Sequence, residues 1–193
     1  MEEASSSKRK QSKCGTSQNS QKIGKGHFHA LQCLNRMEEF RANEILCDVA
    51  LESSDGILFK VHKVVLSSCS SYFQAMFTNE MKESREEKIK MALESNVLKV
   101  LVEFAYTGKM ELKALADVKA VLVAANMLLF SGAETICVEF ITKKMNTRNC
   151  VDIIAFAEVI SSEELSRNAF EFMEKNFVDI SSHKGTAKGG VRD

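Results

Sequence analysis

The sequence contains no proline, no tryptophan and only two tyrosines among its 193 residues. No apolar run approaches the ~20 residues that a membrane-spanning helix needs, and no apolar signal segment opens the chain. The six cysteines form no C-x-x-C pair, and His27 and His29 are spaced for different sides of a helix, so we expect no metal and no cofactor. These absences predict a soluble intracellular protein whose reduced thiols mainly pack in the core.

Neither sign of charge is in excess over the whole chain, because 26 lysines and arginines balance 26 aspartates and glutamates. The distribution is nevertheless uneven. Six basic residues against two acidic ones give residues 1–26 a net charge of +4, and three against one give residues 181–193 a charge of +2. The body from 27 to 180 therefore carries −6, which argues against a nucleic-acid partner and suits a basic protein partner better.

Both ends of the chain are polar and poor in large apolar residues. Such segments cannot offset their ordering entropy by burial, so we expect a disordered basic tail over 1–26 and a flexible tail over 181–193. The cluster KRKQSK at 8–13 has the composition of a nuclear-import signal, although a solvated tail is the simpler interpretation. We expect a cytoplasmic protein, with nuclear entry through this cluster as an additional location.

Large apolar residues recur at steps of three near the start of the body. Because three residues turn an α-helix by about 300°, this stripe drifts by roughly 60° per step and covers over half of the circumference. We infer a helix that buries one side within its own chain and another side against a partner, for which a second copy is the candidate. The members of the stripe are Phe28, Leu31, Leu34, Met37 and Phe40.

The next segment alternates strand and helix patterns. Two apolar runs flank Asp55-Gly56, which is a strong signal for a β-hairpin. Residues 62–70 and 71–78 then predict two short helices, and 88–93 predicts another short strand. The early part of the chain is therefore a hairpin with helices inserted.

The second half is helical almost throughout. The run 95–107 repeats apolar residues at helical spacing, with Ser95 or Asn96 as its cap and Gly108 as its stop. Four more helical patterns follow between 117 and 177, and Ser131-Gly132 separates the first of them from the second. The fold class predicted by this layout is α+β.

One histidine precedes a cluster of potential nucleophiles. His62 could act as a base for the serines and the cysteine of SSCSS at 67–71. However, no G-x-S-x-G turn surrounds these serines, and a hydrolase also needs an orienting group. In a helix, His62 shares a face with Leu66 and Cys69, so we interpret it as a buried, hydrogen-bonded residue. We expect no enzyme activity and keep a hydrolase only as a control hypothesis.

The string CDVALESSDGILFKVHKVVLSSCSSYFQAMFTNEMKES, followed by LVEFAYTGKMEL, resembles the BTB/POZ domain, especially that of the kelch-like proteins. The later run VLVAANMLLFSGAETICVEFITKKMNTRNCVDIIAFAEV is similar to the end of that domain continuing into the family's BACK domain. The resemblance implies a BTB/POZ domain over 27–130, with a small mixed sheet flanked by short helices. It implies that 131–180 holds the end of this domain and the first helices of a partial, all-helical BACK domain.

The resemblance also implies a homodimer assembled largely through the first helix, or a dimer with related BTB proteins. A dimer contact through this helix agrees with its wide apolar stripe. The residues that it assigns to the dimer interface are Phe28, Leu31, Leu34 and Met37.

The family places a charged pair in a largely buried polar pocket. The pair consists of the aspartate of C-D-V and the basic residue after the histidine of A-H-K. The resemblance implies that Asp48, His62 and Lys63 form this pocket here. Because an uncompensated buried charge is costly, each charged group would hold the other in place. Val61 replaces the family's alanine before the histidine, a mild change that we expect to repack.

Kelch-like proteins recruit cullin-3 to build ubiquitin ligases, through an apolar-x-Glu motif after the third short helix. Met81-Lys82-Glu83 stands at that place, and the resemblance assigns Met81 and Glu83, with Tyr72 and Phe73, to cullin binding. A methionine in an apolar socket beside a hydrogen-bonding glutamate is a sensible anchor. The implied protein is an adaptor for an unknown ubiquitination substrate.

A helix pair after the BTB domain extends the family's cullin contact. It matches residues 150–177, and we expect only a minority of its large apolar groups to line a partner groove. Those groups are Val151, Ile154, Phe156, Leu165, Phe170 and Phe177.

The sequence departs from the kelch-like pattern at its end. The 193 residues stop early in the BACK domain and contain no kelch repeats, whose Gly-Gly signatures would be obvious. We therefore expect an adaptor that recruits substrate through its tails or a partner, or a truncated form that competes with full-length relatives. The alternative is a self-association module for transcription or scaffolding that does not bind cullin-3.

Overall fold

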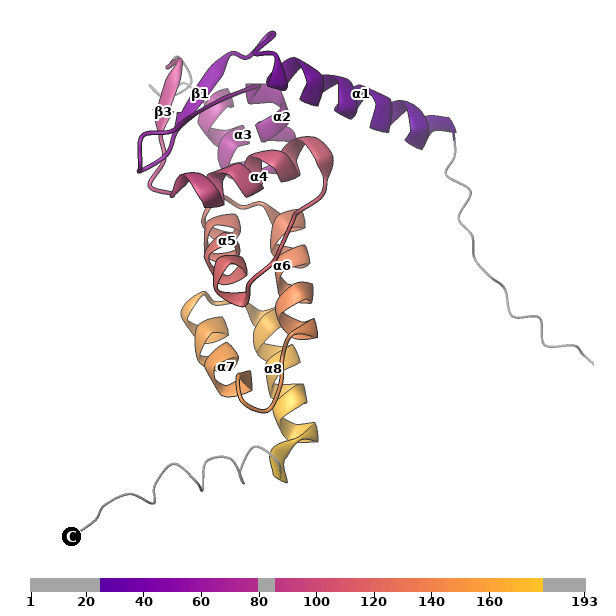
Figure 1. Ribbon diagram of the computed structural model, residues 1–193, viewed down its shortest axis with the longest axis vertical. Coiled ribbons are helices and arrows are strands. Elements are labelled where there is room, and N and C mark those ends of the chain that lie inside the picture. Colours follow the sequence, from indigo (N-terminus) through magenta and orange to yellow (C-terminus); the bar gives the residue numbers. More distant parts are fainter. Residues whose placement is uncertain (1–24, 80–85, 179–193) are drawn as a thin grey trace, which may run out of the picture.

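The computed structural model describes residues 25–79 and 86–178 (Figure 1). The predicted tails lie outside these ranges, apart from Lys25 and Gly26. In chain order the elements are α1 (Lys25–Ala42), β1 (Val49–Glu52), β2 (Leu58–Val61), α2 (Lys63–Cys69), α3 (Ser71–Thr78), β3 (Lys88–Lys90), α4 (Ser95–Thr107), α5 (Leu115–Met127), α6 (Ser131–Lys143), α7 (Cys150–Val159) and α8 (Glu163–Lys175).

A small mixed sheet forms one end of the molecule. Its strand order is β2-β1-β3, with β1 antiparallel to β2 and parallel to β3. Leu51 pairs with Phe59 on one side and with Ile89 on the other, and its side chain is fully buried. Helices α2, α3 and α4 lie close to the sheet, as the sequence pattern predicted for an α+β fold (Figure 1).

The Asp55-Gly56 turn joins β1 to β2 as predicted, and Gly56 has a positive φ of 84°. The prediction of Ser95 or Asn96 as the cap of α4 is wrong, because the helix already begins at Ser95 and Glu94 precedes it without a side-chain cap. Asp55 takes the capping role from the hairpin turn. Its carboxylate accepts from the Ser95 backbone N–H at 2.9 Å and from the Ser95 hydroxyl at 2.6 Å.

Replacing Asp55 with asparagine should lower stability in a pH-dependent way. The hydrogen bonds from Ser95, followed by one from Ser53, hold the pKa of Asp55 below its ordinary value. The carboxylate's contribution is therefore complete above the unfolded pKa of about 3.9 and is lost as pH falls through the lower folded pKa. Urea-denaturation midpoints should separate wild type from Asp55→Asn near about pH 6, and the difference should shrink as pH falls below about 3.9.

Glu174→Gln, which removes an exposed carboxylate on α8, is the matched control for this experiment. It should track the wild type at both pH values. A constant difference between wild type and Asp55→Asn at both pH values would show that the Asp55 charge does not cap α4.

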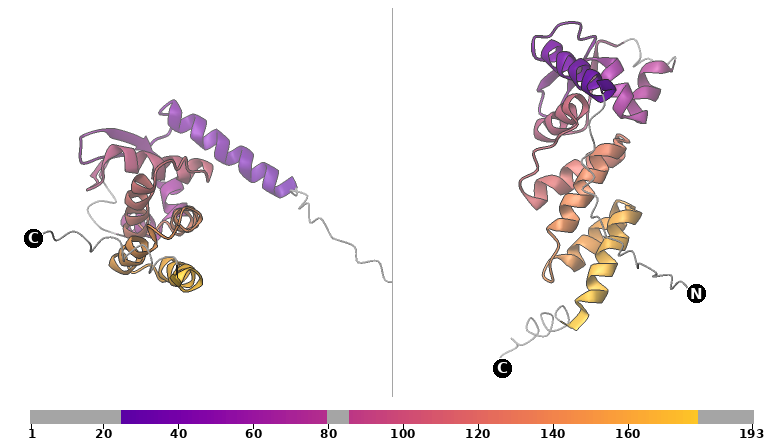
Figure 2. Two further views of the ribbon diagram at one scale, coloured as in Figure 1. Left: turned by 60° about the horizontal axis from the view of Figure 1, so that its bottom comes forward. Right: turned by 90° about the vertical axis from the view of Figure 1, so that its right-hand side faces the viewer.

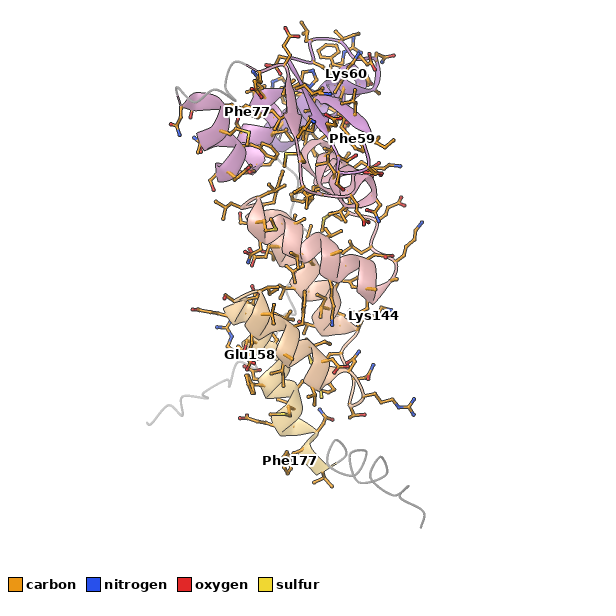
Figure 3. All side chains as sticks on the ribbon, turned by 90° about the vertical axis from the view of Figure 1, so that its left-hand side faces the viewer. Phe59, Lys60, Phe77, Lys144, Glu158 and Phe177 are labelled. Atoms are coloured by element: carbon orange, nitrogen blue, oxygen red, sulfur yellow. The ribbon has the colours of Figure 1, made fainter. Side chains whose placement is uncertain are left out.

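Helices α5 to α8 form an all-helical column below the sheet (Figures 1 and 2). Within it α5 pairs with α6 and α7 pairs with α8, and α6 also contacts α8. In Figure 3, Phe59 and Lys60 mark the sheet end of the molecule and Phe177 marks the far end of the column. The core of the column contains fully buried aliphatic side chains, among them Leu122, Ile141, Ile153 and Leu165.

The column is joined to the sheet end by a buried serine. Ser70 is 2% exposed and caps α3, because its Oγ accepts from the Phe73 N–H at 3.1 Å. The same hydroxyl donates to the Leu128 carbonyl, at the end of α5, at 2.6 Å. One side chain thus fixes both the start of α3 and the position of the α5–α6 turn.

The turn between α5 and α6 differs from the predicted break at Ser131-Gly132, since both of these residues already lie in α6. The reversal occurs at Leu129, which has a positive φ of 53°, and Phe130 N–H donates to the Ala125 carbonyl at 2.8 Å. Gly132 instead provides close packing, because a Cβ there would lie 3.0 Å from the ring of Phe104.

Helix α1 is an 18-residue arm that projects beyond the rest of the fold (Figure 1). It ends in a turn where the Ile45 N–H donates to the Phe40 carbonyl at 2.8 Å. Glu44 and Leu46 have positive φ angles of 55° and 57° in this turn. Among the helices described, none is long and apolar enough to span a membrane.

Candidate functional site

The arm α1 presents large apolar side chains to solvent in the single chain. Phe28 is 60% exposed and Leu31 is 51% exposed, while Met37 is 38% exposed. Leu34, the fourth predicted interface residue, is half-buried. Exposed apolar side chains gathered on one projecting helix are typical of a surface that another protein covers.

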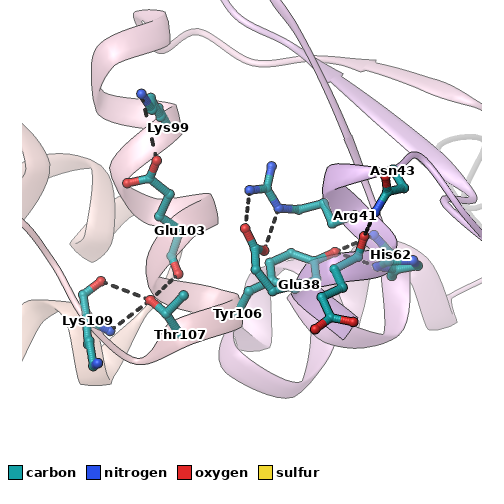
Figure 4. Close-up of polar contacts among 10 residues, drawn as sticks. Glu38, Arg41, Asn43, His62, Lys99, Glu103, Tyr106, Thr107 and Lys109 are labelled. Carbon is teal, nitrogen blue, oxygen red and sulfur yellow. Dashed lines mark hydrogen bonds and ion pairs between the residues drawn. The ribbon is translucent and has the colours of Figure 1, made fainter. Parts of the chain in front are cut away.

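An open groove of about 890 Å³ separates α1 from the end of α4. Leu31 and Met110 are its apolar residues, and Glu38, Glu103 and Glu111 are its acidic ones. The acid groups are partly compensated, because Glu38 binds Arg41 at 2.6 Å and Glu103 lies 3.8 Å from the Lys99 ammonium (Figure 4). The groove therefore presents apolar side chains beside acidic ones and the single lysine of its lining, Lys109.

His62 and Tyr106 form a buried polar pair beneath α1 (Figure 4). The His62 backbone N–H donates to the Tyr106 hydroxyl at 2.9 Å, and His62 Nδ1 lies 2.7 Å from the same oxygen. His62 Nε2 lies 2.9 Å from the Ile45 carbonyl. Because a carbonyl oxygen only accepts, Nε2 donates to it and Nδ1 accepts from the Tyr106 hydroxyl.

Burial sets the electrostatics around this pair. It raises the pKa of Tyr106 to about 12. Burial also raises the pKa of the Cys47 thiol, whose Sγ lies 3.8 Å from His62 Nε2. Arg41 covers the Tyr106 ring at 5.3 Å, and its hydrogen bonds to Glu38 are the main cause of its raised pKa. The group is arranged to keep Tyr106 and Cys47 protonated.

This arrangement does not provide the geometry of a hydrolase. His62 is the N-cap of α2 rather than a residue within it, so the predicted helical face shared with Leu66 and Cys69 is wrong. Both ring nitrogens of His62 are engaged by Tyr106 and Ile45, which leaves none directed at a serine. The expectation of a buried, hydrogen-bonded histidine agrees with this geometry.

The predicted polar pocket is only partly buried in the single chain. His62 is 7% exposed, but Asp48 is exposed and Lys63 is half-buried. The Asp48 carboxylate accepts from the Lys63 backbone N–H at 2.7 Å, so it helps to start α2. The Lys63 ammonium lies 5.5 Å from the centre of the Phe77 ring. Asp48 thus contacts the backbone of Lys63 in the single chain.

Of the residues assigned to cullin binding, Tyr72 and Phe73 lie in the described part of the chain. Tyr72 is 36% exposed on α3 and can meet a partner. Phe73 is 1% exposed and packs between Phe77 and Phe130, at ring-centre distances of 5.7 Å and 6.0 Å. This burial differs from the prediction that Phe73 contacts a partner. Met81 and Glu83 lie outside the described residues.

Comparison with known proteins identifies the fold. A family model described as the BTB/POZ domain matches residues 37–145, which is over half of the chain. The chain belongs to the BTB/POZ domain family. The match includes the mixed sheet, the short helices around it and the column helices α5 and α6. Helices α7 and α8 follow the matched residues.

Two relatives illustrate the similarity. Kelch-like protein 5 from Homo sapiens is 34% identical over 184 residues, and the match covers 88% of this chain and 24% of that protein. The chain therefore spans about a quarter of this curated relative. The BTB domain of zebrafish PATZ1 superimposes with a TM-score of 0.53 at 29% identity, covering 60% of this chain and 92% of that chain. The family resemblance and the fold class predicted from the sequence are confirmed.

Sequence reasoning missed Tyr106, the partner of His62 in this BTB domain. The available signal was a tyrosine at the last turn of an apolar helix, because a buried tyrosine hydroxyl usually needs a hydrogen-bond partner. It also missed Asp55 as a cap, since the hairpin turn explained that residue fully. Both residues act across more than 35 positions of sequence.

Proposed function

We propose that this protein is a homodimeric BTB adaptor that binds cullin-3 and serves in the assembly of a ubiquitin ligase. A BTB/POZ domain with a kelch-like relative supports a protein-interaction role. The observation that carries the dimer is the projecting arm α1, on which Phe28 and Leu31 are more than half exposed. A second copy of the arm would cover this apolar surface with an identical one.

The cullin-3 contact is proposed from the position of Met81 and Glu83 after α3. Tyr72, which is exposed on α3, would add to the cullin-3 contact. Phe73, which is buried, would instead hold α3 in place from the core. On the last helix, Phe170 is 40% exposed, and beyond it Phe177 is 63% exposed, so both are available to a partner. Leu165, by contrast, is fully buried and belongs to the core of the column.

The mechanism of such an adaptor is positioning rather than catalysis. The cullin would bring the catalytic machinery, and the BTB protein would raise the effective concentration of a bound substrate near it. The groups around His62 fit this division of labour, because they stabilise the fold and leave no activated nucleophile among them.

The double variant Met81→Ala/Glu83→Ala should lose about 10–100-fold in affinity for the amino-terminal domain of cullin-3. The reason is that an anchoring apolar side chain and its neighbouring hydrogen-bonding group are removed together. Isothermal titration calorimetry measures the affinity, and sedimentation equilibrium checks that the mass of the dimer is unchanged.

Met127→Ala/Glu139→Ala is the matched control, since it removes an exposed methionine and an exposed glutamate from the helical column. It should bind like the wild type. A well-folded wild-type dimer that shows no saturable binding would overturn the adaptor proposal and would leave self-association alone as the function.

A further inference from the structure

A groove between α4 and α5 is used neither by the proposed dimer nor by the proposed cullin-3 contact (Figure 1). Its volume is about 410 Å³. Val97 and Val121 are buried in its lining. Ala116 and Ala120, which lie one turn apart on α5, leave room in it because their side chains end at Cβ. The groove therefore combines an apolar lining with space for part of another side chain.

The charged residues of this groove are mostly acidic. Three carboxylates and one ammonium group, those of Glu94, Glu111, Asp117 and Lys113, give its lining a net charge of −2. Glu111 lies 4.0 Å from the Lys113 ammonium. Glu94 and Asp117 are exposed, and within the part of the chain that the structure describes their carboxylates form no ion pair or hydrogen bond. Two uncompensated carboxylates thus lie beside an apolar surface.

A lysine or arginine side chain matches both properties of the groove. Its methylene stem packs on apolar surface, while its charged head stays in contact with water or with a carboxylate. In this groove the stem would lie against Val97 and Val121, and the head would reach Glu94 or Asp117. The groove therefore fits a basic segment better than an apolar or an acidic one.

The chain itself contains such a segment. Residues 8–13, KRKQSK, carry four positive charges and no negative one, and the proposed adaptor role does not use them. The groove between α1 and α4 suits this segment less well, because its carboxylates are already paired. Glu38 binds Arg41, and Glu103 lies 3.8 Å from the Lys99 ammonium. Charge complementarity is thus stronger at the α4–α5 groove.

The segment is close enough in the sequence to reach this groove. Lys10 precedes Lys25, the first residue of α1, by 15 positions, and an extended chain of that length spans about 50 Å. Helix α1 contacts α4, and a path along the 18 and 13 residues of both helices is about 47 Å long. Attachment to the same chain also gives the segment a high effective concentration at the groove.

We propose that residues 8–13 dock in the α4–α5 groove of their own chain, with their cationic side chains at Glu94 and Asp117. The contact goes beyond the proposed adaptor role and depends on neither the dimer nor cullin-3. While docked, the basic cluster would be withheld from any other acidic partner, and its release would expose it. The segment would thus act as a reversible cover of the groove.

Carbodiimide cross-linking of the full chain tests this contact, because the reagent joins an amine to a carboxylate where the two groups meet. We expect mass spectrometry of the product with the mass of one chain to find a lysine of residues 8–13 joined to Glu94 or Asp117. A mixture of unlabelled and nitrogen-15-labelled chains identifies the origin of the segment. Docking within one chain gives cross-linked peptides that carry a single isotope.

Limited tryptic cleavage after residues 8–10 provides a second measurement. Cleavage should be about fivefold faster in Glu94→Gln/Asp117→Asn than in wild type, as expected for the loss of two exposed ion pairs. Glu163→Gln/Glu164→Gln is the matched control, since it removes two exposed carboxylates from the first turn of α8. It should be cleaved like the wild type. Far-ultraviolet circular dichroism checks that each variant keeps the fold.

Each other outcome overturns the proposal. Cross-linked peptides of mixed isotopes would show that the segment occupies the groove of a second copy. Equal cleavage of wild type and both variants, or cross-links as frequent at Glu163 and Glu164 as at Glu94 and Asp117, would show that the segment has no preference for this groove. A protein found to be monomeric would overturn the proposed dimer without changing this test.

Discussion

Replacing Phe73 with alanine should lower the free energy of unfolding by about 3–5 kcal/mol. The side chain is 1% exposed, and its ring lies against Phe77 and Phe130, so its removal leaves a cavity between α3 and the α5–α6 turn. Urea denaturation followed by far-ultraviolet circular dichroism measures the change.

Tyr72→Ala is the control for this prediction, because Tyr72 is the exposed neighbour of Phe73. It should cost about 1 kcal/mol or less, mainly through the edge contact between the two rings at 5.5 Å. If Phe73→Ala leaves stability unchanged but abolishes cullin-3 binding, then Phe73 contacts the partner directly and its burial in the single chain is not maintained.

Tyr106→Phe should destabilise the fold by about 2–4 kcal/mol, although it removes a single oxygen atom. The hydroxyl serves two buried groups of His62, its backbone N–H at 2.9 Å and its Nδ1 at 2.7 Å. Without it a donor and an acceptor lose their partner at once, in a place where Tyr106 is fully buried.

Tyr72→Phe removes the same atom from an exposed tyrosine, and it should change stability by less than about 0.5 kcal/mol. Thermal and urea denaturation of the two variants provide the comparison. Equal stability of Tyr106→Phe and Tyr72→Phe would contradict the role given to the Tyr106 hydroxyl.

Local patterns predicted most of the elements correctly. The Asp55-Gly56 turn and the left-handed Gly108 at the end of α4 depend on the conformations of single residues, so neighbouring letters are sufficient to find them. The helices of the column likewise follow from apolar spacing. The family resemblance supplied the arrangement of these elements, which spacing alone does not specify.

Contacts across long stretches of sequence could not be predicted in the same way. Asp55 caps a helix 40 positions later, and Tyr106 binds a histidine 44 positions earlier. Each residue also satisfies a local pattern, as a turn former and as a residue of an apolar helix, so the local sequence does not identify its distant partner. Phe73 is a similar case, because it lies in the core next to Tyr72, which is exposed on the same helix.

The turn that ends α1 sets the direction in which the whole helix projects. At 1.5 Å per residue, the 18 residues of the arm span about 27 Å. A rotation of about 10° at Glu44 would therefore sweep the far end, near Phe28, through about 5 Å. That distance is close to one helical turn, enough to shift apolar partners out of register. The backbone at Glu44 and Leu46 would therefore set the angular tolerance of the proposed dimer, although neither residue belongs to the proposed interface.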